Sequence, residues 1–139
     1  MSYGDPPILD FRDFHMACLC GNNGHGKSAI IDAITWALWG EGRKASIEKK
    51  PDEGLLKIGK TEMMVEFIFD VEGDRYRVIR HYSKSGKTSK SNLEFDIYSP
   101  QSGEYTGLTQ KSVTLTQEKI NQFLRMDYET FINSCVLLQ

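Results

Sequence analysis

The octapeptide GNNGHGKS at residues 21–28 restricts the fold of this chain more than any other feature. It fits the pattern G-x-x-x-x-G-K-[ST], in which glycines let backbone N–H groups turn inward around phosphate oxygens. The short apolar run from His15 to Cys20 predicts a buried strand before it, and the apolar residues from Ser28 to Trp39 predict a helix after it. A strand, this loop and a helix in that order are the context that a phosphate-binding loop (P-loop) requires. We therefore expect an α/β fold that binds a nucleoside triphosphate.

The chemistry of the P-loop assigns a role to each kind of residue in it. The start of the following helix would present unpaired N–H groups and the positive end of the helix dipole. Lys27 would reach the β- and γ-phosphates, and the Ser28 hydroxyl would bind Mg²⁺. No N-K-x-D guanine-reading motif is present, which favours ATP. The predicted nucleotide-binding residues are Gly21, Asn22, Asn23, Gly24, His25, Gly26, Lys27, Ser28 and Ala29.

The rest of the chain predicts one further sheet and two helices. Alternation over residues 63–71 and 76–82 predicts a hairpin, and a polar loop at 83–92 would lead to a third strand at 93–99. The spacing of Thr114 and Gln117 predicts a capping box before a helix, and Asp127 would cap a second helix. Residues 41–61 predict a surface excursion. We expect a single lobe over residues 1–139, with the β-hairpin subdomain at about 63–99 and the helical segment at about 115–134.

Composition and charge exclude several classes of protein. The chain has 139 residues, 17 basic and 19 acidic side chains and a net charge of −2, so it carries no uniformly basic coat. No apolar run is long enough to span a membrane, and the amino-terminal sequence is not that of a secretory signal. Cys18 and Cys20 would share one face of a strand, which favours buried thiols over a metal pair. We expect a reducing, cytoplasmic location.

A local excess of positive charge lies between Arg75 and Leu93, where no acidic residue occurs. Lys84, Lys87 and Lys90 would lie in the loop between two strands and could contact DNA phosphates. A solvated loop explains the same pattern, so both interpretations stay open. Trp36 and Trp39, at helical spacing, are expected in the core rather than stacked on bases.

The segments GNNGHGKSAIIDAITWALWGEGR (residues 21–43) and FINSCVLLQ (residues 131–139) closely resemble the amino-terminal ATPase lobe of the SbcC/Rad-fifty family. Its members are SMC-like, ABC-type ATPases of DNA double-strand-break repair. The resemblance implies a P-loop NTPase fold with a mixed or antiparallel β subdomain packed on the P-loop helix. It makes Gln139 the Q-loop glutamine, which would sense the γ-phosphate and Mg²⁺. It also places Arg43 near the nucleotide, although Arg43 and Lys44 could equally form a solvated charge pair.

The resemblance also implies partners. These are the carboxy-terminal lobe of the same protein, a second copy of the head in an ATP-dependent dimer, a nuclease of the SbcD/Mre-eleven type, and DNA. ATP binding would then control the access of the nuclease to DNA. Other SMC-like ATPases of recombination or chromosome maintenance are an alternative, as is a nucleotide-dependent DNA-binding module without turnover. The long separation between Ser28 and Gln139 argues against a transporter ATPase.

We predict that the 139-residue polypeptide alone hydrolyses ATP negligibly. In the family, the signature motif, an Asp-Glu pair after four apolar residues and a switch histidine follow the Q-loop, and residues 1–139 contain none of these motifs. A carboxylate that holds Mg²⁺ and polarises water would therefore have to come from the carboxy-terminal lobe, whose addition should restore turnover. The measurement is steady-state phosphate release. Sustained multiple turnovers by the 139-residue polypeptide alone would contradict this expectation.

Overall fold

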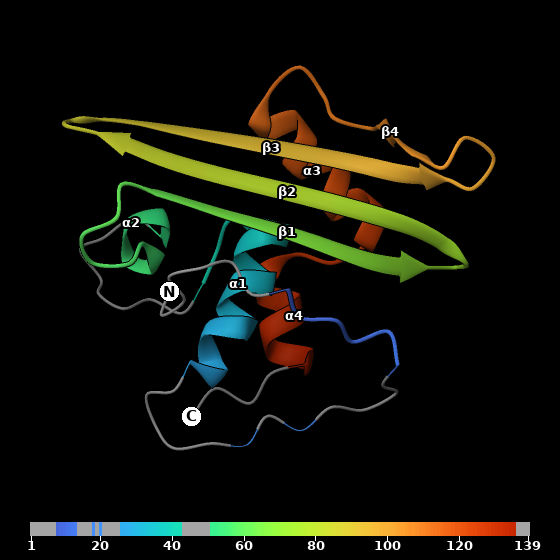
Figure 1. The fold of residues 1–139 in the computed structure, drawn as a ribbon, viewed down its shortest axis with the longest axis horizontal. Coiled ribbons are helices and arrows are strands. Elements are labelled where there is room, and N and C mark those ends of the chain that lie inside the picture. Colours follow the sequence, from blue (N-terminus) through green and yellow to red (C-terminus); the bar gives the residue numbers. More distant parts are fainter. Residues whose placement is uncertain (1–7, 14–17, 19, 21–25, 43–50, 136–139) are drawn as a thin grey trace.

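A computed structural model of the chain describes residues 8–13, 18, 20, 26–42 and 51–135 (Figure 1). Its elements are α1 (Lys27–Trp39), α2 (Pro51–Leu55), β1 (Glu62–Val71), β2 (Asp74–Ser85), β3 (Thr88–Ser99), β4 (Glu104–Gly107), α3 (Val113–Leu124) and α4 (Tyr128–Cys135). The strands form one four-stranded sheet in the order β1-β2-β3-β4, and each neighbouring pair is antiparallel. The strands predicted at 63–71, 76–82 and 93–99 are confirmed, and β4 was not predicted.

Tight turns join the three long strands. Val71 pairs with Asp74, and the two residues between them, Glu72 and Gly73, both have positive φ (54° and 93°), as a type I′ hairpin turn requires. Ser85 pairs with Thr88 around Gly86, whose φ is 61°. The loop predicted at residues 83–92 is therefore wrong, because both strands continue to this turn. Serine, threonine and lysine gave no apolar alternation there. The strands are held by backbone pairing and by the Thr88 hydroxyl, which donates to the Ser85 carbonyl oxygen at 2.8 Å.

The two faces of the sheet have different environments. Side chains on one face pack against α1 and α3, and the fully or nearly fully buried members of this core are Leu38, Trp39, Tyr76, Val78, Leu93, Phe95 and Ile120. On the opposite face Met64 and Ile68 are 63% and 48% exposed. The burial of alternate residues along β1 and β2 confirms the predicted pattern.

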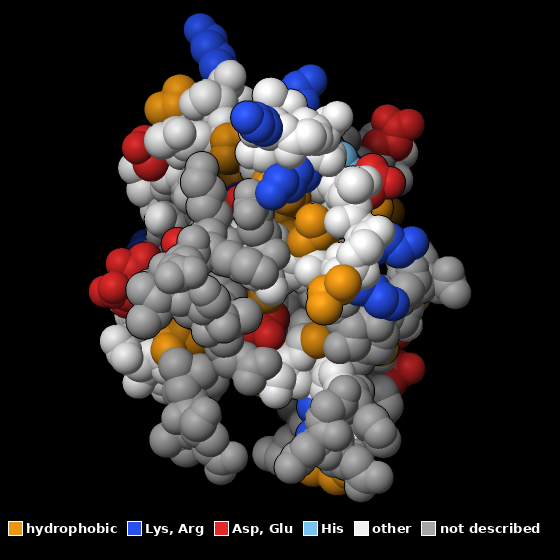
Figure 2. Space-filling model, turned by 90° about the vertical axis from the view of Figure 1, so that its left-hand side faces the viewer, with side chains coloured by type: hydrophobic (Ala, Val, Ile, Leu, Met, Phe, Trp, Pro, Cys, Tyr) orange, Lys and Arg blue, Asp and Glu red, His pale blue; other side chains and the backbone are white. Residues whose placement is uncertain are grey.

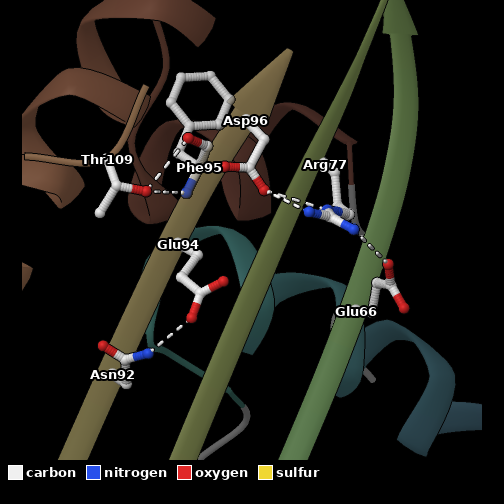
Figure 3. Close-up of polar contacts among 7 residues, drawn as sticks. All are labelled: Glu66, Arg77, Asn92, Glu94, Phe95, Asp96 and Thr109. Carbon is white, nitrogen blue, oxygen red and sulfur yellow. Dashed lines mark hydrogen bonds and ion pairs between the residues drawn. The ribbon is translucent and has the colours of Figure 1, made fainter. Parts of the chain in front are cut away.

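Arg77 joins three strands on the exposed face (Figure 3). Its guanidinium donates to Asp96 Oδ2 on β3 at 2.9 and 3.1 Å and lies 3.6 Å from a carboxylate oxygen of Glu66 on β1. It also lies 4.0 Å from the centroid of the Tyr105 ring on β4. These contacts satisfy the carboxylate of Asp96, which is 7% exposed, and help to fix the register of the strands.

Side-chain caps fix where the last two helices begin. The Ser112 hydroxyl accepts from the Leu115 amide at 3.2 Å, so the predicted cap at Thr114 is wrong and the helix begins earlier. Asp127 accepts from the Thr130 amide at 2.8 Å, which confirms it as the cap of α4. This hydrogen bond holds the pKa of the Asp127 carboxyl below its usual value.

Part of the predicted surface excursion contributes to the core. Helix α2 places Leu55, which is 7% exposed, in a buried cluster with Trp36, Met63 and Tyr82. The Trp36 indole N–H donates to Asp52 Oδ1 at 2.7 Å. The indole N–H of Trp39 donates to the Met126 carbonyl oxygen at 3.1 Å, and the core positions predicted for both tryptophans are confirmed.

The described residues of the amino-terminal segment lie outside the sheet. Residues 8–11 form no strand, and Ile8 is 95% exposed. A turn follows at Arg12 and Asp13. Within the described part of the chain, no helix combines the length and the hydrophobicity that crossing a membrane requires.

We predict that Phe95→Ala lowers the free energy of unfolding by about 3–5 kcal/mol, because it empties a fully buried position between the sheet and α3. Met64→Ala, on the exposed face, is the control and should change the free energy of unfolding by no more than about 0.5 kcal/mol. Urea denaturation followed by circular dichroism measures both. Equal effects of the two substitutions would show that the core does not lie on the face we assign to it.

Candidate functional site

The first turn of α1 contains the described part of the P-loop. Gly26 adopts φ 85° and ψ 5°, a left-handed conformation that favours glycine, and its carbonyl oxygen accepts from the Ala29 amide at 3.0 Å. Lys27 is the first residue of the helix and is half-buried, whereas Ser28 is exposed. The first turn contains no acidic residue that would neutralise the helix dipole. A cation and a hydroxyl at this helix start suit a phosphate and its Mg²⁺.

Only the end of the predicted nucleotide site lies within the described residues. The structure brings together Gly26, Lys27, Ser28 and Ala29 at the start of α1. The other predicted positions, residues 21–25, Arg43 and Gln139, lie outside the described residues, so their roles stay predictions. Among the residues that the structure does describe, no group of three or more His, Cys, Asp or Glu side chains could hold a metal ion.

Cys18 and Cys20 differ from their prediction. Both thiols are exposed, and their Sγ atoms lie 3.4 Å apart. The expectation of buried thiols on a strand is therefore wrong for the two described residues of this segment. The apolar composition of the run predicted burial, but neither cysteine belongs to a strand.

The two halves of α1 differ in burial. Residues 35–39 are all buried, with Trp36 and Ala37 fully inaccessible, whereas Ile31 is 37% exposed. Figure 1 shows the carboxyl end of α1 against the sheet and its blue amino end away from it. In the first half of α1, Asp32 alone is buried, at 8% exposed. The amino-terminal half projects beyond the sheet and contributes the candidate phosphate site.

Two polar side chains that the sequence did not connect with α1 hold its carboxyl end. Arg80 on β2 donates from Nε to the Ala37 carbonyl oxygen at 3.1 Å, and its Nη2 donates to Oε1 of Gln117 on α3. Gln117 Nε2 in turn donates to the Leu38 carbonyl oxygen at 2.8 Å. We call Arg80 and Gln117 the α1 clamp. The one signal in the sequence was an arginine at a core-facing strand position, beside Val78 in the alternation.

The cation of the α1 clamp is deeply buried. Arg80 is 6% exposed, and burial lowers its pKa to about 10, while the charges of Asp52 and Glu41 act in the opposite direction. The guanidinium is therefore protonated at neutral pH. It lies at the negative end of the α1 dipole, where a positive charge is stabilising.

Lysines gather at one end of the sheet, which we call the lysine-bearing end. Figure 2 looks at this end and shows Lys and Arg side chains over its upper part. Its members are Lys57 and Lys60 before β1, Lys84 near the end of β2, Lys87 in the turn and Lys90 near the start of β3. The Lys84 amide donates to the Thr61 carbonyl oxygen at 2.7 Å, so the two segments lie side by side. Neither residues 54–61 nor residues 83–93 contain an acidic side chain.

The structure changes the prediction for the basic segment in two ways. Lys84 is paired with Ser89 within the strands and is half-buried, so it is not the free loop lysine that we expected. Lys87 and Lys90 are exposed. Lys57 and Lys60, also exposed, were missed because they are distant in the sequence and join the others only through strand pairing.

Comparison with known proteins gives a family and several relatives. The model of the AAA domain family matches residues 1–139. The SbcC subunit of nuclease SbcCD from Deinococcus radiodurans is 33% identical over 130 residues, which cover 94% of this chain. The corresponding subunit of nuclease SbcCD from Staphylococcus aureus strain MRSA252 is 36% identical over 104 residues, or 71% of this chain. These alignments span only 14% and 10% of the lengths of the two relatives.

Proposed function

Because this chain belongs to the AAA domain family, and its resemblance to the SbcC family is confirmed by relatives along most of its length, we propose that it is the ATP-binding part of an ATPase. We further propose that this ATPase is the subunit of an SbcCD-like nuclease complex that acts in double-strand-break repair. The start of α1 is the observation that carries the proposal. There a left-handed glycine, a lysine and a serine follow one another at a helix end without acidic residues.

In the proposed site, different residues of this chain would bind the phosphates and the Mg²⁺ of the nucleotide. Backbone N–H groups of the P-loop and of the first turn of α1 would hold phosphate oxygens, and Lys27 would place a positive charge on the β- and γ-phosphates. Ser28 and Gln139 would bind Mg²⁺, which neutralises phosphate charge when it is bound. Arg43 would lie near the nucleotide. The exposure of Ser28 is compatible with this role.

We propose the partners on the basis of the SbcC resemblance. The carboxy-terminal lobe would complete each site, and two heads would dimerise on ATP. This ATP-dependent cycle would control the access of a nuclease subunit of the SbcD type to DNA. The names of the relatives, which are subunits of a nuclease, support the last of these partners.

The lysine-bearing end is the proposed DNA contact of this chain. Lysine ammonium groups neutralise phosphates without reading sequence, and the serines around Lys87 add hydroxyl donors for phosphate oxygens. Lys57 and Lys60 extend the three lysines predicted from the sequence into one surface across the starts of β1 and β3. Binding there would be strongly dependent on salt and independent of sequence.

We predict that Lys27→Ala weakens ATP binding by about 10- to 100-fold, the loss expected for a hydrogen bond to a charged group. Titration of a fluorescent ATP analogue, with the carboxy-terminal lobe present, measures the affinity. Lys57→Ala removes an exposed lysine outside α1 and is the control. An unchanged ATP affinity after Lys27→Ala would remove the support for a phosphate site at the start of α1.

We also predict that replacing Lys84, Lys87 and Lys90 together with glutamine lowers the slope of log K against log salt by about 2 to 3, at about 0.9 for each phosphate contact. Because Lys84 is half-buried, the lower value is expected. Lys57→Gln with Lys60→Gln should remove about 2 more on the same basis. DNA titrations at several salt concentrations, with the assembled head and ATP, provide the slopes.

Arg75→Gln, at the opposite end of β2, is the matched control for the lysine substitutions. It also removes one positive charge from the same strand, and it should leave the slope unchanged. ATP affinity should be unaffected in all of these variants. A slope that does not change in the triple variant would show that the lysine-bearing end is merely solvated.

A further inference from the structure

Tertiary contacts satisfy two of the last carbonyl groups of α1, and a local cap satisfies a third. The Trp36 carbonyl oxygen accepts from the Gly40 amide at 2.8 Å, the Ala37 oxygen from Arg80 and the Leu38 oxygen from Gln117. A helix end normally leaves its last carbonyls to water or to a local cap. Here two of them are held by β2 and α3 instead, so the position of α1 is fixed relative to both elements.

The members of the α1 clamp also hold each other. Arg80 donates to Gln117, and Gln117 Nε2 donates to Asn121 Oδ1 one turn later at 2.9 Å as well as to α1. Among the described residues no buried side-chain nitrogen or oxygen lacks a hydrogen-bond partner. A satisfied buried network of this kind has one low-energy arrangement, and losing either member leaves buried polar groups unpaired.

Because α1 is held at its carboxyl end, the contacts there set the direction in which its amino end points. The buried half of the helix is at the clamp, and the half with Lys27 and Ser28 projects away from the sheet. A helix of 13 residues is about 20 Å long at about 1.5 Å per residue. A tilt of roughly 10° at the clamp would therefore move the first turn by roughly 3 Å. Misplacements of about 1 Å already weaken positioned sites.

We propose that Arg80 and Gln117 are positioning residues, which set the direction of α1 and so the place of the phosphate-binding end. This inference rests on the proposed function of the first turn of α1. Arginine suits the role because its planar group reaches the Ala37 carbonyl and Gln117 together, which a lysine ammonium cannot do in the same geometry. Gly40 leaves space for it, since a Cβ there would lie 3.0 Å from Arg80 Nη1.

Hydrogen exchange of the nucleotide-free chain tests the inference directly. Arg80→Met should speed amide exchange along all of α1, including Ile30 to Ile34, by about tenfold relative to the β2–β3 amides, as expected when a helix loses a buried charged hydrogen bond. Phe95→Ala, which also disrupts the core but leaves the clamp intact, should not speed amide exchange in α1 more than in the β2–β3 amides. Faster exchange confined to residues 36–40 after Arg80→Met would mean a local cap and would overturn the inference.

A second pair of variants keeps Arg80 and serves if Arg80→Met does not fold. Gly40→Ala places a methyl group against the guanidinium, whereas Gly103→Ala has the same φ of 72° with no atom within 4 Å of the new Cβ. Both carry the same kind of backbone strain. Only Gly40→Ala should increase exchange in the amino-terminal half of α1. Equal exchange of that half in the two variants would contradict the role of the clamp.

ATP binding separates this inference from the proposed function. With the carboxy-terminal lobe present, Arg80→Met should weaken ATP binding by about tenfold at a temperature at which circular dichroism shows it folded. Phe95→Ala should change the affinity less than twofold. If the unsubstituted protein binds no ATP, the proposed function fails. The exchange experiment would still test whether the clamp sets the direction of α1. If Lys27→Ala abolishes binding and Arg80→Met leaves it unchanged, the clamp inference fails alone.

Discussion

The packing of the second half of α1 is the interaction on which the other described elements depend. Trp39 lies 4.9 Å from the Phe131 ring and 6.5 Å from the Tyr128 ring, centroid to centroid, which docks α4. Trp36 holds α2 through its hydrogen bond to Asp52, and Leu38 joins the core between the sheet and α3. The two tryptophans thus contact different elements, Trp36 contacting α2 and Trp39 contacting α4. The second half of α1 therefore contacts α2, α4 and the core between the sheet and α3.

Charge at the carboxyl end of α1 has the sign that the helix dipole favours. A buried guanidinium lies at the carboxyl end, and the amino end has a lysine and no acidic residue. The two ends therefore suit different partners: at the carboxyl end Arg80 donates to the Ala37 carbonyl oxygen, and the first turn suits a phosphate. A buried cation costs desolvation, and its hydrogen bonds offset that cost only while the network stays complete. The clamp therefore favours one position of the helix.

Patterns that depend on local sequence predicted the fold well, and those that depend on tertiary pairing did not. Apolar alternation found β1 and most of β2, and Asp127 was identified as a cap because its partner is three residues away. The polar ends of β2 and β3 gave no such alternation, since each is stabilised by the other strand. Gln117 fitted a local capping box, but its partners on α1 and β2 are remote in sequence. Side chains that join distant elements carry no local pattern.

Strand β2 connects the two surfaces to which we assign ligands. Arg80 binds the carboxyl end of α1, and Lys84 lies four positions later, about 13 Å along the strand at about 3.3 Å per residue. Both neighbours of β2 pair with it along nearly its whole length, so this part of the sheet resists bending. A displacement of α1 large enough to matter at Gly26 must either break the clamp or move β2. As long as Arg80 and Gln117 remain hydrogen-bonded, we therefore expect the P-loop end of α1 and the lysine-bearing end to move together.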